Sequence, residues 1–267
     1  MKELSLRYPI WLCDVWGVVH DGVSPIASAV SALEKHRAHG GKVILITNAP
    51  RPKATIQAHL DQMPVPRAAY DDMVTSGDVT RALMLQFGKH GLYHLGPKTD
   101  EPLFEGLDVK RVGLDQAGAV ICTGFFDEMR ETAKDYLPQL EQMKSRGLKM
   151  ICANPDKVVR RGKLLLPCAG AIAEEYEIIG GQVEMAGKPF APIYDLALER
   201  AGVSDKSQVL AIGDGPDTDV KGAAQNGLPC IFITDGINTS ADPMADVKKK
   251  YPTARILKSM PELYWQG

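Results

Sequence analysis

The sequence predicts an α/β protein with a parallel-sheet core and a second α/β domain inserted into it, and three observations support this. Short apolar runs alternate with stretches of helical periodicity. Polar residues follow several of these runs directly. The pattern of the first 77 residues gives way to a separate α/β pattern and resumes after Gly180-Gly181. We therefore expect a core domain of residues 1–77 and 183–267, with residues 78–182 as the insert.

The elements of the N-terminal part alternate as a parallel sheet requires. Apolar runs predict strands over residues 10–14, 42–47 and 73–76. Between them, helical periodicity predicts helices over 25–39, ended by Gly40-Gly41, and over 52–63. Strands joined by helices are typical of a parallel sheet with helical crossovers.

The remaining elements continue this alternation. In the insert, strands are predicted over 92–95, 118–123 and 148–153, and helices over 77–87 and 127–146, the latter interrupted near Pro138. In the C-terminal part, helices are predicted over 189–201 and 216–226, and strands over 208–213 and 229–234.

Composition excludes several classes of protein. The 267 residues carry a net charge of −2, and no Lys/Arg stripe interleaved with aromatic residues points to a nucleic-acid partner. No apolar run is long enough to span a bilayer and the N-terminal residues lack the apolar segment of a signal peptide, so we expect a cytoplasmic protein without a membrane partner. The five cysteines are odd in number and form no CxxC motif, which favours buried thiols over disulfides or zinc ligands.

The first candidate functional residue is Asp14, at the end of the first predicted strand. A carboxylate there lies where open α/β sheets bind ligands, and it suits a nucleophile or a metal ligand. The main-chain carbonyl of Trp16 is free to bind a hard cation, and Gly17 allows backbone amides to approach a ligand closely. Taken alone, an aspartate at a strand end is more often a cap or a turn residue.

Three further candidates carry groups that suit a phosphate. Thr47 and Asn48 follow the second strand and offer a hydroxyl, an amide and backbone N–H groups, although a turn or a helix cap is favoured for this pair alone. Lys188 comes just before Pro189 at a predicted helix start, where a cation opposes the helix dipole. That placement favours a bound anion, with a solvated lysine as the alternative.

The strongest single motif is GDGPDTD at residues 213–219, which places three carboxylates in six residues after an apolar strand. Clustered acids repel one another unless a cation or hydrogen-bond donors compensate, and oxygen ligands suit a hard divalent cation. We therefore favour a metal site at this loop over a helix cap with solvated acids. A carboxylate nucleophile, a hydroxyl and amide pair, a lysine and an acidic metal loop together match the needs of phosphoryl transfer.

This ordered set resembles the haloacid dehalogenase superfamily, and within it the NagD-like or p-nitrophenyl phosphatase-like subclass IIA. The segment from Asp14 to Val19 matches the first motif, Thr47-Asn48 the second, Lys188 in GKP the third and GDGPDTD the fourth. Features of the cap also match, namely Thr75-Ser76, Asn154-Pro155-Asp156, Gly162 and Cys168-Ala-Gly170. The resemblance covers nearly the whole chain and implies a Rossmann-like parallel-sheet core with an inserted α/β cap domain.

The resemblance also implies roles for these residues. The nucleophile that forms an aspartyl-phosphate would be Asp14. The ligands of Mg²⁺ would be Asp14, the Trp16 carbonyl, Asp214 and, directly or through water, Asp219. The groups that bind the phosphate would be Thr47, Asn48 and the catalytic Lys188. The cap residues that close over the site and help to select the leaving group would be Asn154 and Asp156.

Trp16 departs from the family pattern, because phosphatases of this family usually carry an aspartate there. That aspartate protonates the leaving alcohol and later activates water, a contribution of about 10²–10⁴-fold that indole cannot supply. Slow turnover or a stalled phosphoenzyme follows from its loss. His20 and Asp21 are candidates to replace it, although a role as flap or turn residues is favoured for both.

We therefore expect a Mg²⁺-dependent hydrolase that acts on a small phosphorylated metabolite such as a sugar or nucleotide phosphate. The alternative is a degenerate member of the family that binds a phosphorylated ligand without efficient turnover. A third option is another chemistry of the superfamily, with attack on carbon disfavoured because the acidic fourth motif favours Mg²⁺. Large-capped relatives often pair through their caps, so a homodimer of that kind is a further option.

Overall fold

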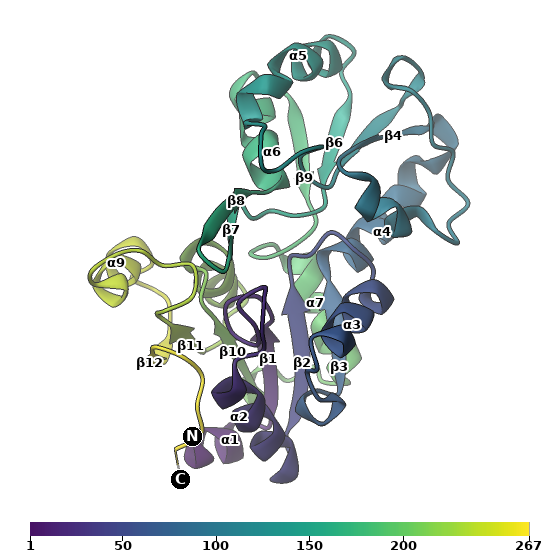
Figure 1. Ribbon diagram of the computed structural model, residues 1–267. Coiled ribbons are helices and arrows are strands. Elements are labelled where there is room, and N and C mark those ends of the chain that lie inside the picture. Colours follow the sequence, from purple (N-terminus) through teal and green to yellow (C-terminus); the bar gives the residue numbers. More distant parts are fainter. Residues whose placement is uncertain (267) are drawn as a thin grey trace.

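The computed structural model describes residues 1–266, and its largest element is a six-stranded parallel sheet (Figure 1). The strand order is β12-β11-β10-β1-β2-β3. Their bounds are Ile10–Asp14 for β1, Lys42–Thr47 for β2, Asp72–Thr75 for β3, Val209–Gly213 for β10, Cys230–Ile233 for β11 and Ile256–Met260 for β12. The chain therefore builds β1 to β3 outward on one side, and the C-terminal part adds β10 to β12 on the other.

Helices cover both faces of this sheet, which explains why its strands are continuous apolar runs. Trp11 and Cys13 point to the face covered by α2 (Ala27–Ala38) and α3 (Lys53–Gln62). Leu12 points to the opposite face, where it packs with α7 (Ala191–Ala201), α8 (Lys221–Gln225) and α9 (Pro243–Lys250). A short helix, α1 (Lys2–Arg7), precedes β1.

The topology brings the candidate loops to one edge of the sheet. β1 pairs in parallel with both β2 and β10, so the carboxyl ends of these three strands lie side by side. The strand order reverses between β1 and β10, and such a switch point is where open α/β sheets bind ligands. Asp14, Thr47 and Gly213 are the last residues of these strands.

The insert forms a second parallel sheet of four strands in the order β4-β5-β6-β9. The strands are Leu92–Leu95, Ala119–Cys122, Lys149–Cys152 and Gln182–Met185. One face packs on α5 (Leu137–Ser145) and α6 (Ala169–Ile178), and the other on α4 (Ser76–Phe87). Since α4 begins at Ser76 and β9 ends at Met185, we propose slightly wider limits for the insert than residues 78–182.

A two-stranded antiparallel hairpin leaves the second sheet between β6 and α6. Its strands are β7 (Val158–Arg161) and β8 (Leu164–Pro167), and Arg161 pairs with Leu164 across a two-residue turn. Figure 1 shows this hairpin between the two sheets, above the carboxyl end of β1. It is the part of the insert that approaches the candidate loops.

Most predicted elements are confirmed to within two residues, but two helix predictions are wrong in part. The helix predicted over 127–146 is reduced to the 3₁₀ turn Ala133–Tyr136 and α5, because a capping box of Thr132 and Asp135 begins the helical structure there. The helix predicted over 216–226 begins as a π turn, Pro216–Val220, before α8. The hairpin, α6, β9, α9 and β12 were not predicted.

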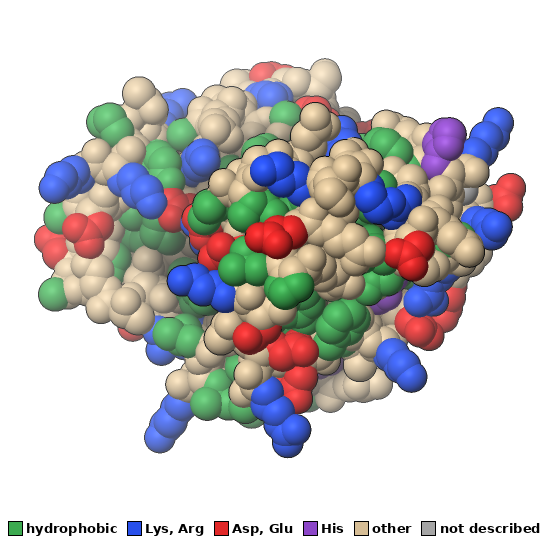
Figure 2. Space-filling model, turned by 90° about the horizontal axis from the view of Figure 1, so that it is seen from above, with side chains coloured by type: hydrophobic (Ala, Val, Ile, Leu, Met, Phe, Trp, Pro, Cys, Tyr) green, Lys and Arg blue, Asp and Glu red, His purple; other side chains and the backbone are tan. Residues whose placement is uncertain are grey.

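Three further observations bear on the class of protein. On the face of the described residues that Figure 2 shows from above, basic and acidic side chains are intermixed among apolar ones, and positive charge is not concentrated. Within residues 1–266, no helix is both long enough and apolar enough to cross a membrane. The five cysteines are buried and unpaired, as predicted.

Candidate active site

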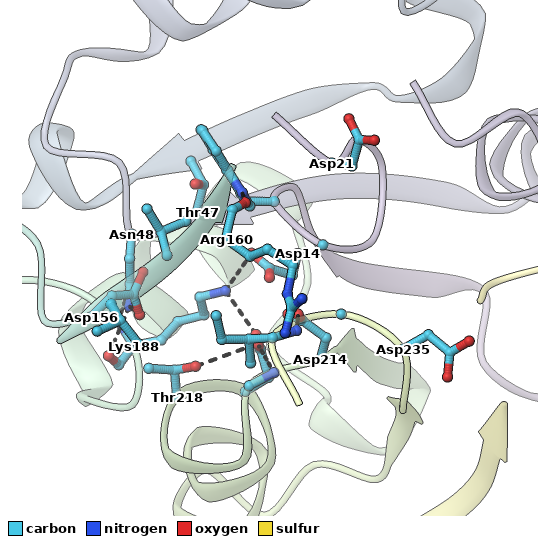
Figure 3. Close-up of a pocket in the computed structure, with 18 of the residues that line it drawn as sticks. Asp14, Asp21, Thr47, Asn48, Asp156, Arg160, Lys188, Asp214, Thr218 and Asp235 are labelled. Atoms are coloured by element: carbon cyan, nitrogen blue, oxygen red, sulfur yellow. Dashed lines mark hydrogen bonds and ion pairs between the residues drawn. The ribbon is translucent and has the colours of Figure 1, made fainter. Parts of the chain in front are cut away.

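A cavity at the carboxyl edge of the core sheet collects nearly all of the predicted site residues (Figure 3). Its lining includes Asp14, Trp16, Thr47, Asn48, Asp156, Lys188, Asp214 and Asp219. Asn154 is the predicted residue that is not part of this lining. The insert contributes the hairpin strand β7, so the cavity lies between the two sheets.

Lys188 is the buried cation of the cavity. Its Nζ lies 2.5 Å from Oδ1 of Asp14 and 2.7 Å from Oδ1 of Asp219, and the lysine is only 2% exposed. Burial alone would lower the pKa of Lys188, but the carboxylates of Asp14 and Asp219 hold it well above its ordinary value. Lys188 is therefore a fixed positive charge beside the strand-end carboxylate.

Three buried carboxylates, Asp14, Asp214 and Asp219, form the acidic cluster of the cavity. Each offers an oxygen within 4.8 Å of the others. Burial raises the pKa of Asp14 well above its ordinary value, and the charge of Asp219 adds to the rise. Burial, again with Asp219, raises the pKa of Asp214 to about 7. One lysine thus faces three carboxylates, and the excess negative charge of the cluster would be offset by a further cation.

Neighbouring backbone groups hold two of these carboxylates in place. The Gly215 N–H donates to Oδ2 of Asp219 at 3.0 Å, so both oxygens of Asp219 have partners. The Ile237 N–H donates to Oδ2 of Asp214 at 2.5 Å. A Cβ at Gly236 would lie 1.8 Å from that same oxygen, so this position requires glycine. The loop after β11, which we did not predict as part of the site, therefore orients Asp214.

Asn48 connects the core to the insert. Its Nδ2 donates to Oδ1 of Asp156 at 2.9 Å and to the Lys188 carbonyl at 3.2 Å, while its Oδ1 accepts from the Lys188 N–H at 2.7 Å. The side-chain amide predicted to bind phosphate is thus engaged within the protein. Burial raises the pKa of Asp156, against the effects of Lys188 and Asn48. Thr47 lies beside Asn48 with its hydroxyl oxygen accepting from the Ala49 N–H at 3.3 Å.

Asn154 shapes the loop and does not line the cavity. Its Oδ1 accepts from the Asp156 N–H at 3.0 Å, which is a local turn of the kind that asparagine favours. In this structure the Asn154 side chain therefore positions Asp156, and its contact with the substrate stays a prediction.

The Trp16 side chain is half-buried and forms a hydrogen bond to the insert. Its indole Nε1 donates to the main-chain carbonyl of Arg160 in β7 at 2.5 Å. On its other side the ring packs edge-on against His20, with ring centroids 5.0 Å apart. The sequence analysis treated Trp16 as a lost acid/base group, whereas the structure gives its side chain a contact with the hairpin.

Both candidates for the missing acid/base group accept backbone N–H groups, and of the two only Asp21 lines the cavity. His20 is buried outside the cavity lining, its Nδ1 accepts from the Gly22 N–H at 3.0 Å, and burial lowers its pKa to about 4. Asp21 accepts backbone N–H groups from Val23 and Ser24, which lower its pKa. Figure 3 shows its carboxylate pointing away from Asp14.

The cavity also contains residues that sequence reasoning missed, of which Arg160 is the most prominent. It belongs to β7 and lines the cavity from the insert side. In the sequence, Val158-Val159-Arg160-Arg161 shows no signal that separates a cavity residue from a surface one. The Trp16 hydrogen bond, which spans 144 positions, identifies the side of the hairpin that faces the core.

Comparison with known proteins agrees with this arrangement. A family model described as haloacid dehalogenase-like hydrolase matches residues 11–110, and one described as HAD-hydrolase-like matches residues 185–263. The crystal structure of a hydrolase of the haloacid dehalogenase-like family from Brucella suis 1330 is 44% identical, with a TM-score of 0.89 over 98% of each chain.

Two further relatives carry more specific names. The D-glycerol 3-phosphate phosphatase of Mycobacterium tuberculosis is 26% identical over 100% of this chain and 77% of its own. A crystal structure of a glycerol phosphate phosphatase from the same organism, in complex with magnesium, is 24% identical. It covers 97% of this chain and 76% of its own with a TM-score of 0.74. From the matched motifs, the fold and the 44% identical relative, the chain belongs to the haloacid dehalogenase-like family of hydrolases, in subclass IIA with its inserted α/β cap.

Proposed function

We propose that the chain is a Mg²⁺-dependent phosphatase that hydrolyses a small phosphorylated metabolite through an aspartyl-phosphate on Asp14. The observation that carries this proposal is the position of Asp14, buried at the switch point with Lys188 at 2.5 Å and two further carboxylates beside it. A relative named for hydrolysis of D-glycerol 3-phosphate supports the reaction class.

The acidic cluster fits a hard divalent cation. Its three carboxylates are buried, offer only oxygen and lie within 4.8 Å of one another. Burial, and after it the charge of Asp219, raises the pKa of Asp214 to about 7, and a bound cation would favour the ionised form. Asp14, Asp214 and the Trp16 carbonyl would hold Mg²⁺, with Asp219 supporting them. When bound, Mg²⁺ would offset negative charge on the phosphoryl oxygens.

The protein groups then divide the reaction between them. A carboxylate oxygen of Asp14 forms a bond to phosphorus while the bond from phosphorus to the leaving oxygen breaks. Lys188, fixed beside Asp14, offsets the charge of the phosphoryl oxygens, and the Thr47 hydroxyl is placed to donate to one of them. Water then cleaves the aspartyl-phosphate, which releases inorganic phosphate and restores Asp14.

Proton transfer is the step for which the cavity lacks a group at position 16. Indole neither gives nor accepts the proton that the leaving oxygen requires, and His20 and Asp21 are turned to other partners. We therefore propose slow turnover for substrates whose leaving oxygen needs a proton. The same observation favours the second candidate function, a protein that binds a phosphorylated ligand without efficient turnover.

One assay separates the two candidates. Hydrolysis of p-nitrophenyl phosphate and of a metabolite panel is measured with Mg²⁺ for the wild type and for Asp14→Asn. The matched control is Asp217→Asn, which removes an exposed carboxylate of the same motif that pairs with Lys250. We expect turnover that disappears in Asp14→Asn and persists in Asp217→Asn. Mg²⁺-dependent ligand binding without turnover by the wild type would instead establish the binding protein.

A further inference from the structure

Arg160 brings a guanidinium into the cavity from the cap. Resting on the proposed phosphatase function, we propose that Arg160 binds a carboxylate on the leaving group, so that the preferred substrates are compact phosphate monoesters that also carry a carboxylate. Figure 3 shows the Arg160 side chain reaching from the hairpin toward Asp14 and Asp214.

The two adjacent arginines of β7 lie in opposite environments. The Arg161 guanidinium lies 3.0 Å from a carboxylate oxygen of Glu128, within the cap. Arg160 lines the cavity, and within residues 1–266 no carboxylate lies within 4.0 Å of its guanidinium. Alternation along a strand places successive side chains on opposite faces, so Arg161 is a natural comparison for Arg160.

The Arg160 side chain also has an unmet hydrogen-bonding requirement. Its Nε is buried and has no acceptor among the described residues. A buried donor without a partner is destabilising, more so when the group is charged, so an acceptor supplied by a ligand would offset that cost. The planar guanidinium fork matches the two oxygens of a carboxylate.

Arg160 and the core residues reach the cavity from different sides, which assigns Arg160 to the leaving group and the core residues to the phosphoryl group. Asp14, Thr47 and Lys188 stand at the carboxyl ends of the core strands or in a core loop and face the cavity from below the cap. Attack by Asp14 requires the leaving oxygen to depart on the opposite side of phosphorus. Arg160 enters from that opposite side, because it belongs to the cap hairpin.

The size of the cavity restricts the substrate further. Its volume is about 130 Å³. Pockets for drug-sized ligands measure roughly 300–1,000 Å³. The cavity therefore suits a phosphate with a short carbon chain, and a carboxylate is a small enough second anion to reach Arg160 from such a chain.

Trp16 is the positioning residue for Arg160. Its indole N–H holds the Arg160 carbonyl at 2.5 Å, and the Gly162 N–H donates to the Asp21 carbonyl at 3.2 Å. These two bonds hold the hairpin on the core loop that follows β1. A carboxylate at position 16 has no N–H to donate, so the residue that removes the usual acid also fixes the arginine.

A matched substrate pair tests the proposal. Glycerol 3-phosphate and 3-phosphoglycerate differ at one carbon, which belongs to a hydroxymethyl group in the first and to a carboxylate in the second. We expect the wild type to favour 3-phosphoglycerate by about tenfold or more in kcat/KM, as an arginine–carboxylate pair allows. Arg160→Met should abolish the preference, Arg160→Lys should keep part of it, and Arg161→Met should retain it.

The positioning role of Trp16 is tested with the same pair of substrates. Trp16→Phe keeps an aromatic ring and removes the N–H, so we expect KM for 3-phosphoglycerate to rise more than kcat falls. Because Trp16 acts through Arg160, adding Trp16→Phe to Arg160→Met should raise KM for 3-phosphoglycerate no further. A further rise of KM in the double variant would show that Trp16 acts separately and would overturn the positioning role.

Binding experiments separate this proposal from the proposed function. With Mg²⁺, calorimetric titration of Asp14→Asn with both compounds measures recognition without turnover. Tighter binding of 3-phosphoglycerate that depends on Arg160 supports the proposal even if the wild type hydrolyses nothing, which would overturn the phosphatase alone. Equal hydrolysis and equal binding of both compounds, or an equal loss for both in Arg160→Met, would overturn the role of Arg160 and leave the phosphatase intact.

Discussion

The floor of the cavity, made of Asp14, Lys188, Asp214 and Asp219, differs sharply from its roof, the hairpin β7–β8. Every floor residue is at most 6% exposed, and charged or backbone partners hold the side chains. The roof leaves Val158, Leu164 and Leu165 about half exposed. Two hydrogen bonds join it to the loop after β1. The groups for chemistry are thus fixed by buried ionic and backbone partners, while the group for selectivity is carried by a lightly held element.

The largest effect should come from the floor. Lys188→Met removes the cation between two buried carboxylates, so we expect kcat to fall by about 10²–10³-fold. The free energy of unfolding without Mg²⁺ should fall by about 3–5 kcal/mol, because a buried pair loses one partner. Steady-state kinetics and urea unfolding measure the two effects.

The control for Lys188→Met is Lys250→Met, which breaks an exposed pair with Asp217. That change should cost less than about 1 kcal/mol and leave kcat intact. Comparable losses of kcat and of unfolding free energy in the two variants would show that the buried ion pairs of the floor contribute no more than an exposed pair.

The next effect lies where floor and roof meet. Trp16→Asp supplies the missing carboxyl group, so hydrolysis of glycerol 3-phosphate should rise by up to about 10²-fold. p-Nitrophenyl phosphate, whose leaving group needs no proton, should gain much less. The same variant loses the bond to Arg160 and should lose its preference for 3-phosphoglycerate. If hydrolysis of glycerol 3-phosphate and hydrolysis of p-nitrophenyl phosphate gain equally, protonation of the leaving group is not what the native residue withholds.

The third effect is the pH dependence of Mg²⁺ binding to the floor. Asp214 has a pKa of about 7, raised first by burial and then by Asp219, so below that pH its proton must leave before the cation binds. Affinity should therefore fall by about tenfold for each pH unit below 7, if one proton is displaced. Calorimetric titration at pH 6, 7 and 8 measures this, and an affinity that is unchanged across the range would contradict it.

The smallest effect should come from the tip of the roof. Gly162 has a φ of +58°, where an L-residue costs about 1–2 kcal/mol. Gly162→Ala should lower the free energy of unfolding by that amount and change the 3-phosphoglycerate preference a few-fold. Gly202→Ala, at φ +69° far from the hairpin, has the same backbone cost and should leave the preference unchanged. Equal effects of both variants on the preference would mean that the hairpin tip does not influence selectivity.

The floor could be predicted from sequence because its determinants are local. β1 and β2 are apolar runs with clear ends, and the carboxyl ends of parallel strands meet at one edge. These features predict that Asp14, Thr47 and the loop at 213–219 lie together, whereas Lys188 follows β9 of the insert's sheet and not a core strand. The sequence does not predict that the Asn48 amide is bonded within the protein, because its bonds to Asp156 and Lys188 join residues more than 100 positions apart.

The roof could not be predicted in the same way. The segment VVRR has no periodicity that assigns one arginine to the cavity and the other to Glu128. Their difference arises from how the hairpin sits on the core, which the Trp16 and Gly162 hydrogen bonds determine. Asn154 was assigned to the substrate for a similar reason, since a turn residue and a ligand residue look alike in sequence.

The pairing of β1 with β10 also determines when the site can exist during synthesis. β1 leaves the ribosome early, but β10 begins only at Val209, roughly 195 residues after the end of β1. At about 5–20 residues per second, that interval lasts about 10–40 s. The cap is one continuous segment and ends at Met185, before β10 begins. Asp14 therefore gains Lys188 and Asp219 as partners only after the last third of the chain has been synthesised, when the cap segment is already present.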